Sequence, residues 1–208
     1  MIAAVVFDFD GTLVDSNQIK RDAYFFAFER VRVTHRYITQ VLKEHPGKDR
    51  YFIISAVVES LPPTPALTRS DRDRIRRGAV RLYSAYCRKK VSDARDFAGV
   101  TDTLRSLSRT YRLAINSATP ERQLRQLVAA RPWARYCTAV VGAPSTKVAN
   151  LRKIAKRFSL QPREIMFIGD SPFDAAAATQ FGCEFAPASD LKKLPSLIAR
   201  RNGQSANA

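Results

Sequence analysis

The sequence is poor in the residues that build disulfide frameworks, zinc sites and membrane spans. It has 3 cysteines in 208 residues, widely separated at Cys87, Cys137 and Cys183, and no CxxC pair. An odd number of scattered cysteines argues against a disulfide or zinc scaffold. We therefore expect the three cysteines to act as small buried hydrophobic residues. The longest apolar run near the N-terminus, residues 2–7, is too short for a membrane span and lacks signal-peptide features. We therefore expect a cytoplasmic protein that does not enter the membrane.

Acidic residues are also scarce, with 19 Asp and Glu against 35 Lys and Arg, so the net charge is +16. The excess is spread over the chain and is not confined to one basic arm. Such a surface attracts polyanions and small anionic substrates. A nucleic-acid-associated phosphatase or binding protein is therefore an alternative. It is not favoured, because the sequence has no helix-turn-helix, zinc-finger or aromatic RNA-binding motif.

Hydrophobic residues make up 45% of the chain, which is typical of a globular protein. Short apolar segments typical of buried strands lie at residues 2–7, 112–116, 138–142 and 164–168. Helical patterns alternate with them at 100–107, 120–130, 147–158 and 172–181, and Thr119 is the expected N-cap of the helix that starts at Pro120. This alternation predicts an α/β fold, a Rossmann-like three-layer core with a parallel sheet.

The α/β alternation is interrupted after the first strand by a block with helical patterns only. The helices are expected at 17–32, 35–45, 50–60 and 71–90, separated by a turn at 45–47 and a proline-rich loop at 62–65. We therefore expect a core domain of residues 1–15 and 96–202. Residues 16–95 would form an inserted α-helical cap domain, and 203–208 a flexible tail.

Two carboxylates follow the first strand, in a segment where Asp8 and Asp10 point the same way. Active sites of α/β proteins lie at the carboxyl ends of the strands. Acids this close repel one another unless a proton or a cation intervenes, and Mg²⁺ prefers such oxygen ligands. Gly11 lets the backbone turn and approach a bound phosphate. The alternative interpretation is that these are ordinary turn residues.

Comparable polar groups follow the later strands. Asp170 ends the fourth strand, and Asp174 lies at the start of the next helix, where it could simply favour the helix dipole. Ser117 and neighbouring amides, including that of Ala118, could hold a phosphate oxygen. Lys147 opens a helix, where a cation is unfavourable unless it has a function. Each of these residues alone is weak evidence for an active site. The stronger evidence is the order in which they follow one another along the chain.

In that order the residues resemble the haloacid dehalogenase superfamily of phosphohydrolases. The resemblance covers about residues 1–16 and 96–190, and its specific motifs are DFDGTLVDS at 8–16 and GDSPFD at 169–174. Ser117 and Lys147 match the weaker second and third motifs. One departure is Asn116-Ser117-Ala118-Thr119, where many members have Ser/Thr-Asn.

The resemblance implies a role for each matched residue. Asp8 would be the nucleophile and Asp10 the general acid and base, while Ser117 and Lys147 would bind the phosphoryl group. Mg²⁺ would be held by Asp8, Asp10 through its main-chain carbonyl, and Asp170. Asp174 would help to hold the ion or Lys147.

The second acid, Asp10, argues for phosphate ester hydrolysis, because a halide leaves without needing a proton. The helical insertion resembles the cap of phosphoglycolate phosphatases and β-phosphoglucomutases, so Lys48 and Arg50 in its turn are candidate specificity residues. Basic loop residues are, however, often only solvated. We expect a small phosphorylated metabolite as substrate, with a phosphomutase as the alternative. No pattern indicates an oligomeric state.

Overall fold

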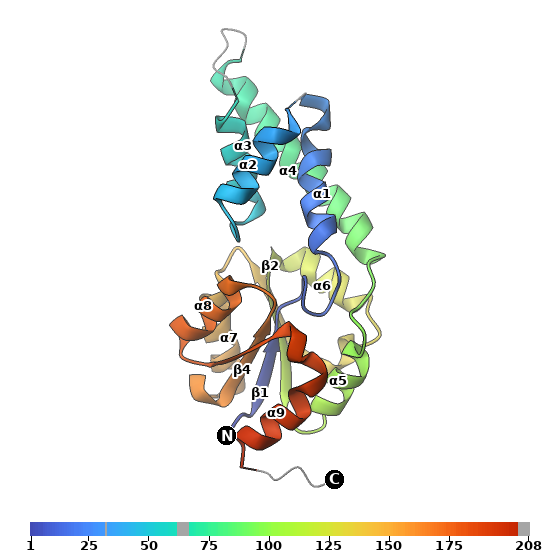
Figure 1. Ribbon diagram of the computed structural model, residues 1–208, viewed down its shortest axis with the longest axis vertical. Coiled ribbons are helices and arrows are strands. Elements are labelled where there is room, and N and C mark those ends of the chain that lie inside the picture. Colours follow the sequence, from blue (N-terminus) through green and yellow to red (C-terminus); the bar gives the residue numbers. More distant parts are fainter. Residues whose placement is uncertain (32, 62–66, 204–208) are drawn as a thin grey trace. The chain divides into compact units, whose positions relative to one another are not determined.

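The computed structural model describes residues 1–31, 33–61 and 67–203. Its contacts divide the chain into two compact units. One comprises Met1–Asp15 and the chain from Ala94 onward, and the other is Ser16–Asp93 (Figure 1). The sequence placed the second boundary at residues 95/96. The expected loop at 62–65 and the tail from 204 lie outside the described residues.

The first unit is built on a parallel sheet of 5 strands in the order β3-β2-β1-β4-β5. The strands are β1 Ala4–Phe7, β2 Arg112–Pro120, β3 Cys137–Ala143, β4 Ile165–Gly169 and β5 Glu184–Pro187. Central strand β1 pairs with β2 and β4, so that Phe7 lies beside Ile115 and Ile168. The carboxyl ends of β1, β2 and β4 therefore meet at one edge of the sheet.

Helices cover both faces of this sheet, with α7 and α8 on one face and α5 and α9 on the other (Figure 1). Their bounds are α5 Val100–Leu107, α6 Glu121–Ala129, α7 Lys147–Phe158, α8 Pro172–Phe181 and α9 Leu194–Arg201. Val6, Phe167, Leu151 and Ala178 are buried together between the sheet and the helices α7 and α8. The predicted three-layer α/β fold is confirmed.

Two local expectations for this unit were wrong or incomplete. Thr119 does not cap α6, because β2 continues to Pro120, which pairs with Ala143 and is itself the N-cap. Pro120 has an extended ψ of 131°, so β2 runs four residues past the expected strand end at Asn116 and the helix begins at Glu121. Strand β5, the following 3-10 segment Ala188–Lys193 and α9 were not predicted.

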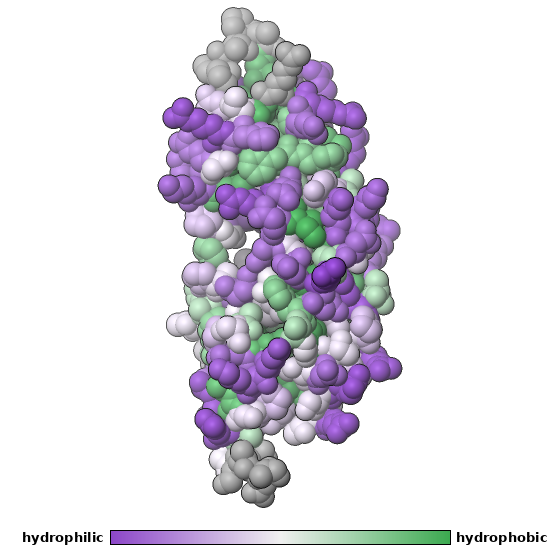
Figure 2. All heavy atoms as spheres, turned by 45° about the vertical axis from the view of Figure 1, so that its right-hand side comes forward, coloured by the Kyte–Doolittle hydropathy of each residue, from purple (hydrophilic) through white to green (hydrophobic). Residues whose placement is uncertain are grey.

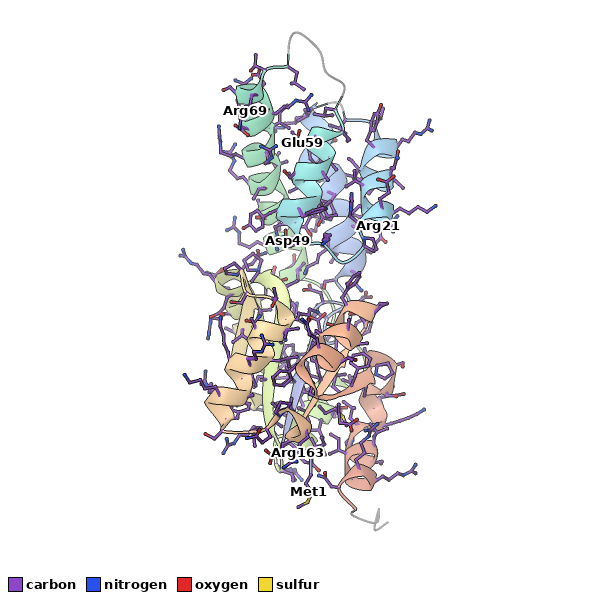
Figure 3. The ribbon with its side chains drawn as sticks, turned by 90° about the vertical axis from the view of Figure 1, so that its left-hand side faces the viewer. Met1, Arg21, Asp49, Glu59, Arg69 and Arg163 are labelled. Carbon is purple, nitrogen blue, oxygen red and sulfur yellow. The ribbon has the colours of Figure 1, made fainter. Side chains whose placement is uncertain are left out.

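The second unit is helical, with α1 Asn17–Phe28, α2 His35–Glu44, α3 Arg50–Glu59 and α4 Arg69–Ser92. Helices α1 and α3 pack against α4. The expected helix 17–32 ends at Phe28 and continues as a 3-10 turn, Glu29–Val31. Asp49 caps α3 by accepting from the amide of Phe52 at 2.9 Å, and Glu59 lies at the other end of that helix (Figure 3).

Hydrophilic side chains cover much of the visible surface in the space-filling view, with apolar patches between them (Figure 2). Cys87 is buried, whereas Cys137 and Cys183 are only partly buried. Across the described residues, no helix combines the length and apolar character needed to span a bilayer.

Candidate active site

Three carboxylates converge at the carboxyl edge of the sheet. Asp8 follows β1, Asp170 follows β4, and Asp174 lies in the first turn of α8. One oxygen from each lies within 4.8 Å of those of the other two. The amide of Asp8 donates to the carbonyl of Ile168 at 2.8 Å, which continues the β1–β4 pairing to the residue that carries the acid. Asp8 is only 5% exposed, whereas Asp170 faces solvent.

Lys147 is the cation of this cluster. Its Nζ lies 3.1 Å from Asp8 Oδ2, contacts Asp174 Oδ1 and lies 5.8 Å from the ring centre of Phe167. Burial alone would lower the pKa of Lys147. The charges of Asp8 and Asp174 outweigh that effect and hold this pKa above its ordinary value. Lys147 therefore remains a cation beside two carboxylates.

The electrostatic balance at Asp8 is unfavourable for an ionised carboxylate without further positive charge. Burial, reinforced by the charges of Asp174 and Asp10 and opposed by Lys147, raises the pKa of Asp8 to about 7. Oδ1 of Asp8 is buried and has no hydrogen-bond partner among the described residues. A buried acceptor without a partner is costly. The oxygen-only donor set and this orphaned atom fit a hard divalent cation such as Mg²⁺.

Asp10 is buried, and its carboxylate is directed to a different set of partners. Oδ2 accepts hydrogen bonds from the hydroxyls of Ser117 at 3.2 Å and Thr119 at 3.0 Å. Ser117 Oγ also accepts from the amide of Thr119 at 3.0 Å. Ser117, expected to follow the strand that starts at Arg112, lies within β2 and beside Asp10. The sequence did not identify Thr119 as a site residue, because the pattern predicted a helix N-cap there and not a strand residue.

Asp174 combines two roles that the sequence left as alternatives. Its Oδ2 accepts from the amide and hydroxyl of Ser171, at 3.1 and 2.6 Å, in a capping box at the start of α8. Its Oδ1 contacts Lys147. A Cβ on Gly169 would lie 2.4 Å from Cβ and Cγ of Asp174. Only glycine at position 169 leaves room for this carboxylate.

The loop after β1 turns tightly at Gly11, which has φ 76°. Its amide donates to the carbonyl of Val14 at 2.9 Å, and the amides of Leu13 and Val14 both donate to the carbonyl of Phe9. Ala118, the expected amide donor to phosphate, is exposed between the buried residues Ser117 and Thr119.

A buried pair of asparagines places Lys147. Asn116 Nδ2 donates to the main-chain carbonyl of Lys147 at 2.9 Å, and Asn116 Oδ1 accepts from Asn150 Nδ2 at 3.1 Å. The first turn of α7 is therefore tied to β2. Asn116 stood out in the sequence only as a departure from the usual second motif, and nothing there singled out Asn150.

The two candidate specificity residues, Lys48 and Arg50, belong to the helical unit and differ in solvent exposure. Lys48 is exposed, with Nζ 5.2 Å from the ring centre of Phe52. Arg50, at the start of the expected helix, is the first residue of α3 and is 6% exposed. Its guanidinium lies 4.8 Å from the ring centre of Tyr83 and donates to Ser84 Oγ at 3.1 Å.

The family model described as haloacid dehalogenase-like hydrolase matches residues 5–188. The chain belongs to this family. No curated protein sequence matches the chain. Hydrolase chemistry is thus shown by the family, and the predicted membership is confirmed.

Solved structures share the fold at low sequence identity. A predicted phosphoglycolate phosphatase from Haemophilus somnus is 21% identical, with TM-score 0.70 over 88% of this chain and 84% of that chain. A predicted phosphatase from Clostridium acetobutylicum is 19% identical, with TM-score 0.70 over 89% and 83%. CbbY from Rhodobacter sphaeroides, solved with phosphate, is 18% identical, with TM-score 0.69 over 90% and 86%.

Proposed function

We propose that this hydrolase cleaves small organic phosphate monoesters through a covalent aspartyl-phosphate on Asp8, with Mg²⁺ as cofactor. The observation that carries the proposal is the environment of Asp8. Its Oδ2 lies against Lys147, its buried Oδ1 has no hydrogen-bond partner in the described part of the chain, and its carboxylate clusters with those of Asp170 and Asp174. The fold shared with a predicted phosphoglycolate phosphatase and with a phosphate-bound protein agrees with it.

The first chemical step is attack by the Asp8 carboxylate on phosphorus. A bond forms between Asp8 and phosphorus as the bond to the ester oxygen breaks, and Asp10 gives its proton to the departing alkoxide. The hydroxyls of Ser117 and Thr119 orient Asp10 for this transfer. Lys147 carries positive charge to the phosphoryl oxygens, which otherwise repel an anionic nucleophile.

The second step returns the enzyme to its starting state. Water attacks phosphorus, Asp10 takes its proton, and the bond to Asp8 breaks, which releases inorganic phosphate. Asp8 and Asp170, with the main-chain carbonyl of Asp10, would hold the Mg²⁺, and Asp174 would help to fix the ion or Lys147. When bound, Mg²⁺ supplies positive charge that offsets the developing negative charge of the phosphoryl group.

The direct test is phosphate release from a panel of small sugar and carboxylate phosphates, with MgCl₂ or with EDTA. We expect release only with Mg²⁺, and a loss of about 10³-fold or more in Asp8→Asn. Asp102→Asn is the matched control, because Asp102 is exposed on α5. Full activity of a pure Asp8→Asn preparation would contradict the proposal. Conversion of substrate to an isomer with little phosphate release would indicate a mutase instead.

A further inference from the structure

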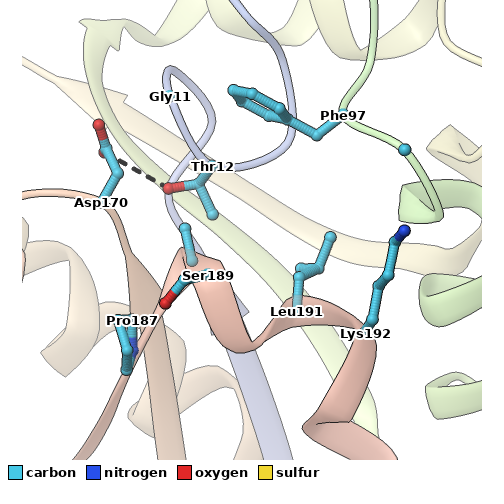
Figure 4. A pocket seen from close by; sticks show the side chains of 10 residues that line it. Gly11, Thr12, Phe97, Asp170, Pro187, Ser189, Leu191 and Lys192 are labelled. Atoms are coloured by element: carbon cyan, nitrogen blue, oxygen red, sulfur yellow. Dashed lines mark hydrogen bonds between the residues drawn. The ribbon is translucent and has the colours of Figure 1, made fainter.

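A cavity lies in the first unit, beside the loop that follows β1. Its volume is about 610 Å³, within the range of small-molecule sites. Three segments form its walls: the Gly11–Thr12 loop, the stretch before α5, and the segment from Pro187 to Lys192 (Figure 4). Of the clustered carboxylates, only Asp170 borders it. The cavity therefore adjoins the candidate catalytic cluster without coinciding with it.

The lining is chiefly apolar. Phe97 presents a ring that is 38% exposed, and Leu191 lies across the cavity from it (Figure 4). The hydroxyl-bearing side chains of Thr12 and Ser189 lie between them and Asp170. Apolar walls with a few polar groups suit an organic molecule with a flat or hydrophobic body.

Lys192 is the cation of this cavity. Within the described ranges of the chain, its ammonium makes no hydrogen bond or ion pair with another residue. Its stem passes close to Gly99, where a Cβ would lie 3.3 Å from Lys192 Cε. Gly99 has φ 88° and so combines a left-handed backbone with room for this stem. The positive charge of Lys192 thus lies at the border of a mainly apolar cavity and is not paired with a carboxylate of the described residues, although Asp170 also lines the cavity.

We propose that this cavity binds a small amphipathic organic anion, with its apolar body against Phe97 and Leu191 and its anionic group at Lys192. The occupant also touches Thr12, whose hydroxyl lies 3.5 Å from Asp170 Oδ1. The occupant would therefore contact the loop that follows Asp8 and Asp10. The occupant is either the organic part of the phosphate ester or a separate molecule. Binding itself does not rest on the proposed function, but its effect on turnover does.

Calorimetric titration with naphthalene-1-sulfonate tests the site, with the uncharged naphthalene-1-sulfonamide as comparator. We expect Lys192→Gln to weaken sulfonate binding by about fivefold, the upper end for a solvent-exposed ion pair. Sulfonamide binding should be unchanged in this variant. Lys193→Gln is the matched control, because Lys193 is exposed and does not line the cavity. Phe97→Ala should weaken both compounds.

Three results would overturn the proposal: no sulfonate binding at millimolar concentration, equal affinity of the parent protein and Lys192→Gln, or an equal loss in Lys193→Gln. Phe97 and both lysines are exposed or partly exposed, so their variants should keep the circular dichroism spectrum and melting temperature of the parent.

Inhibition of phosphate release by the sulfonate then distinguishes the two sources of the anion. Competition with phenyl phosphate indicates the organic part of the substrate, and a change in kcat without competition indicates a separate molecule. If the parent protein releases no phosphate from any ester, the proposed function fails while the calorimetric result stands.

Discussion

Nζ of Lys147 lies 3.1 Å from Oδ2 of Asp8 and also contacts Oδ1 of Asp174, so one partly buried cation joins the end of β1 to the first turn of α8. Asp174 also caps α8 through Ser171. The same ion pairs therefore hold the candidate nucleophile in place and stabilise the fold around it. Changes here should affect catalysis and stability together.

Replacing Lys147 by methionine should show this double role. Two buried carboxylates would lose their cation, and we expect the free energy of unfolding to fall by about 3 kcal/mol. Because the phosphoryl oxygens also lose a positive charge, kcat should fall by about 10²-fold or more. Urea unfolding and phosphate release measure the two effects. Lys156→Met, an exposed change on the same helix, should alter neither.

Thr119 is expected to act through Asp10. Thr119→Val removes one of the two hydroxyls that orient the Asp10 carboxylate. We expect kcat to fall by about tenfold, the effect of losing roughly one hydrogen bond, with little change in KM. Thr119→Ser keeps the hydroxyl and should restore most of the rate. Equal losses in the valine and serine variants would contradict this account, because the serine variant keeps the hydroxyl that bonds Asp10.

Replacing Gly169 and Gly78 by alanine should change the free energy of unfolding in opposite directions. In Gly169→Ala the new methyl would meet Asp174 at 2.4 Å, so we expect a loss of about 1–3 kcal/mol in unfolding free energy together with reduced activity. Gly78 lies inside α4, and a Cβ there has no atom within 4 Å. Gly78→Ala should therefore stabilise the protein by up to about 1 kcal/mol. Differential scanning calorimetry measures both shifts.

Replacing Arg50 should lower the free energy of unfolding more than replacing Lys48. Arg50→Met removes a buried guanidinium from the Tyr83 ring and from Ser84, and should lower the unfolding free energy by about 1–3 kcal/mol. Lys48→Met changes an exposed side chain and should cost less than about 0.5 kcal/mol. An unchanged stability in Arg50→Met would contradict a stabilising role for its contacts with Tyr83 and Ser84.

Much of the core is visible in the sequence, because buried parallel strands are continuous apolar runs and acids at their ends mark the edge where chemistry occurs. The Ile2–Phe7 run and Asp8 that follows it could be interpreted this way from the letters alone. The short strand Glu184–Pro187 could not, because four residues that end in proline resemble a loop.

Side-chain contacts between neighbouring elements also could not be predicted from the sequence. Thr119 contacts Asp10 only because β2 continues to Pro120, and the order Thr-Pro-Glu is an equally good helix start. Arg50 was a candidate for substrate contact because it follows the turn at Gly47, and only the packing of α3 against α4 shows that it is buried. Register and packing, which single-sequence patterns do not carry, decide such contacts.

The central claim, covalent catalysis by Asp8, is tested most directly by trapping the intermediate. Borohydride reduces an acyl phosphate to an alcohol, so enzyme quenched during turnover and treated with it should contain homoserine at position 8. Peptide mapping by mass spectrometry should find this change only when substrate and Mg²⁺ are both present. An unmodified Asp8 under turnover conditions, or reduction at another acid, would contradict the account.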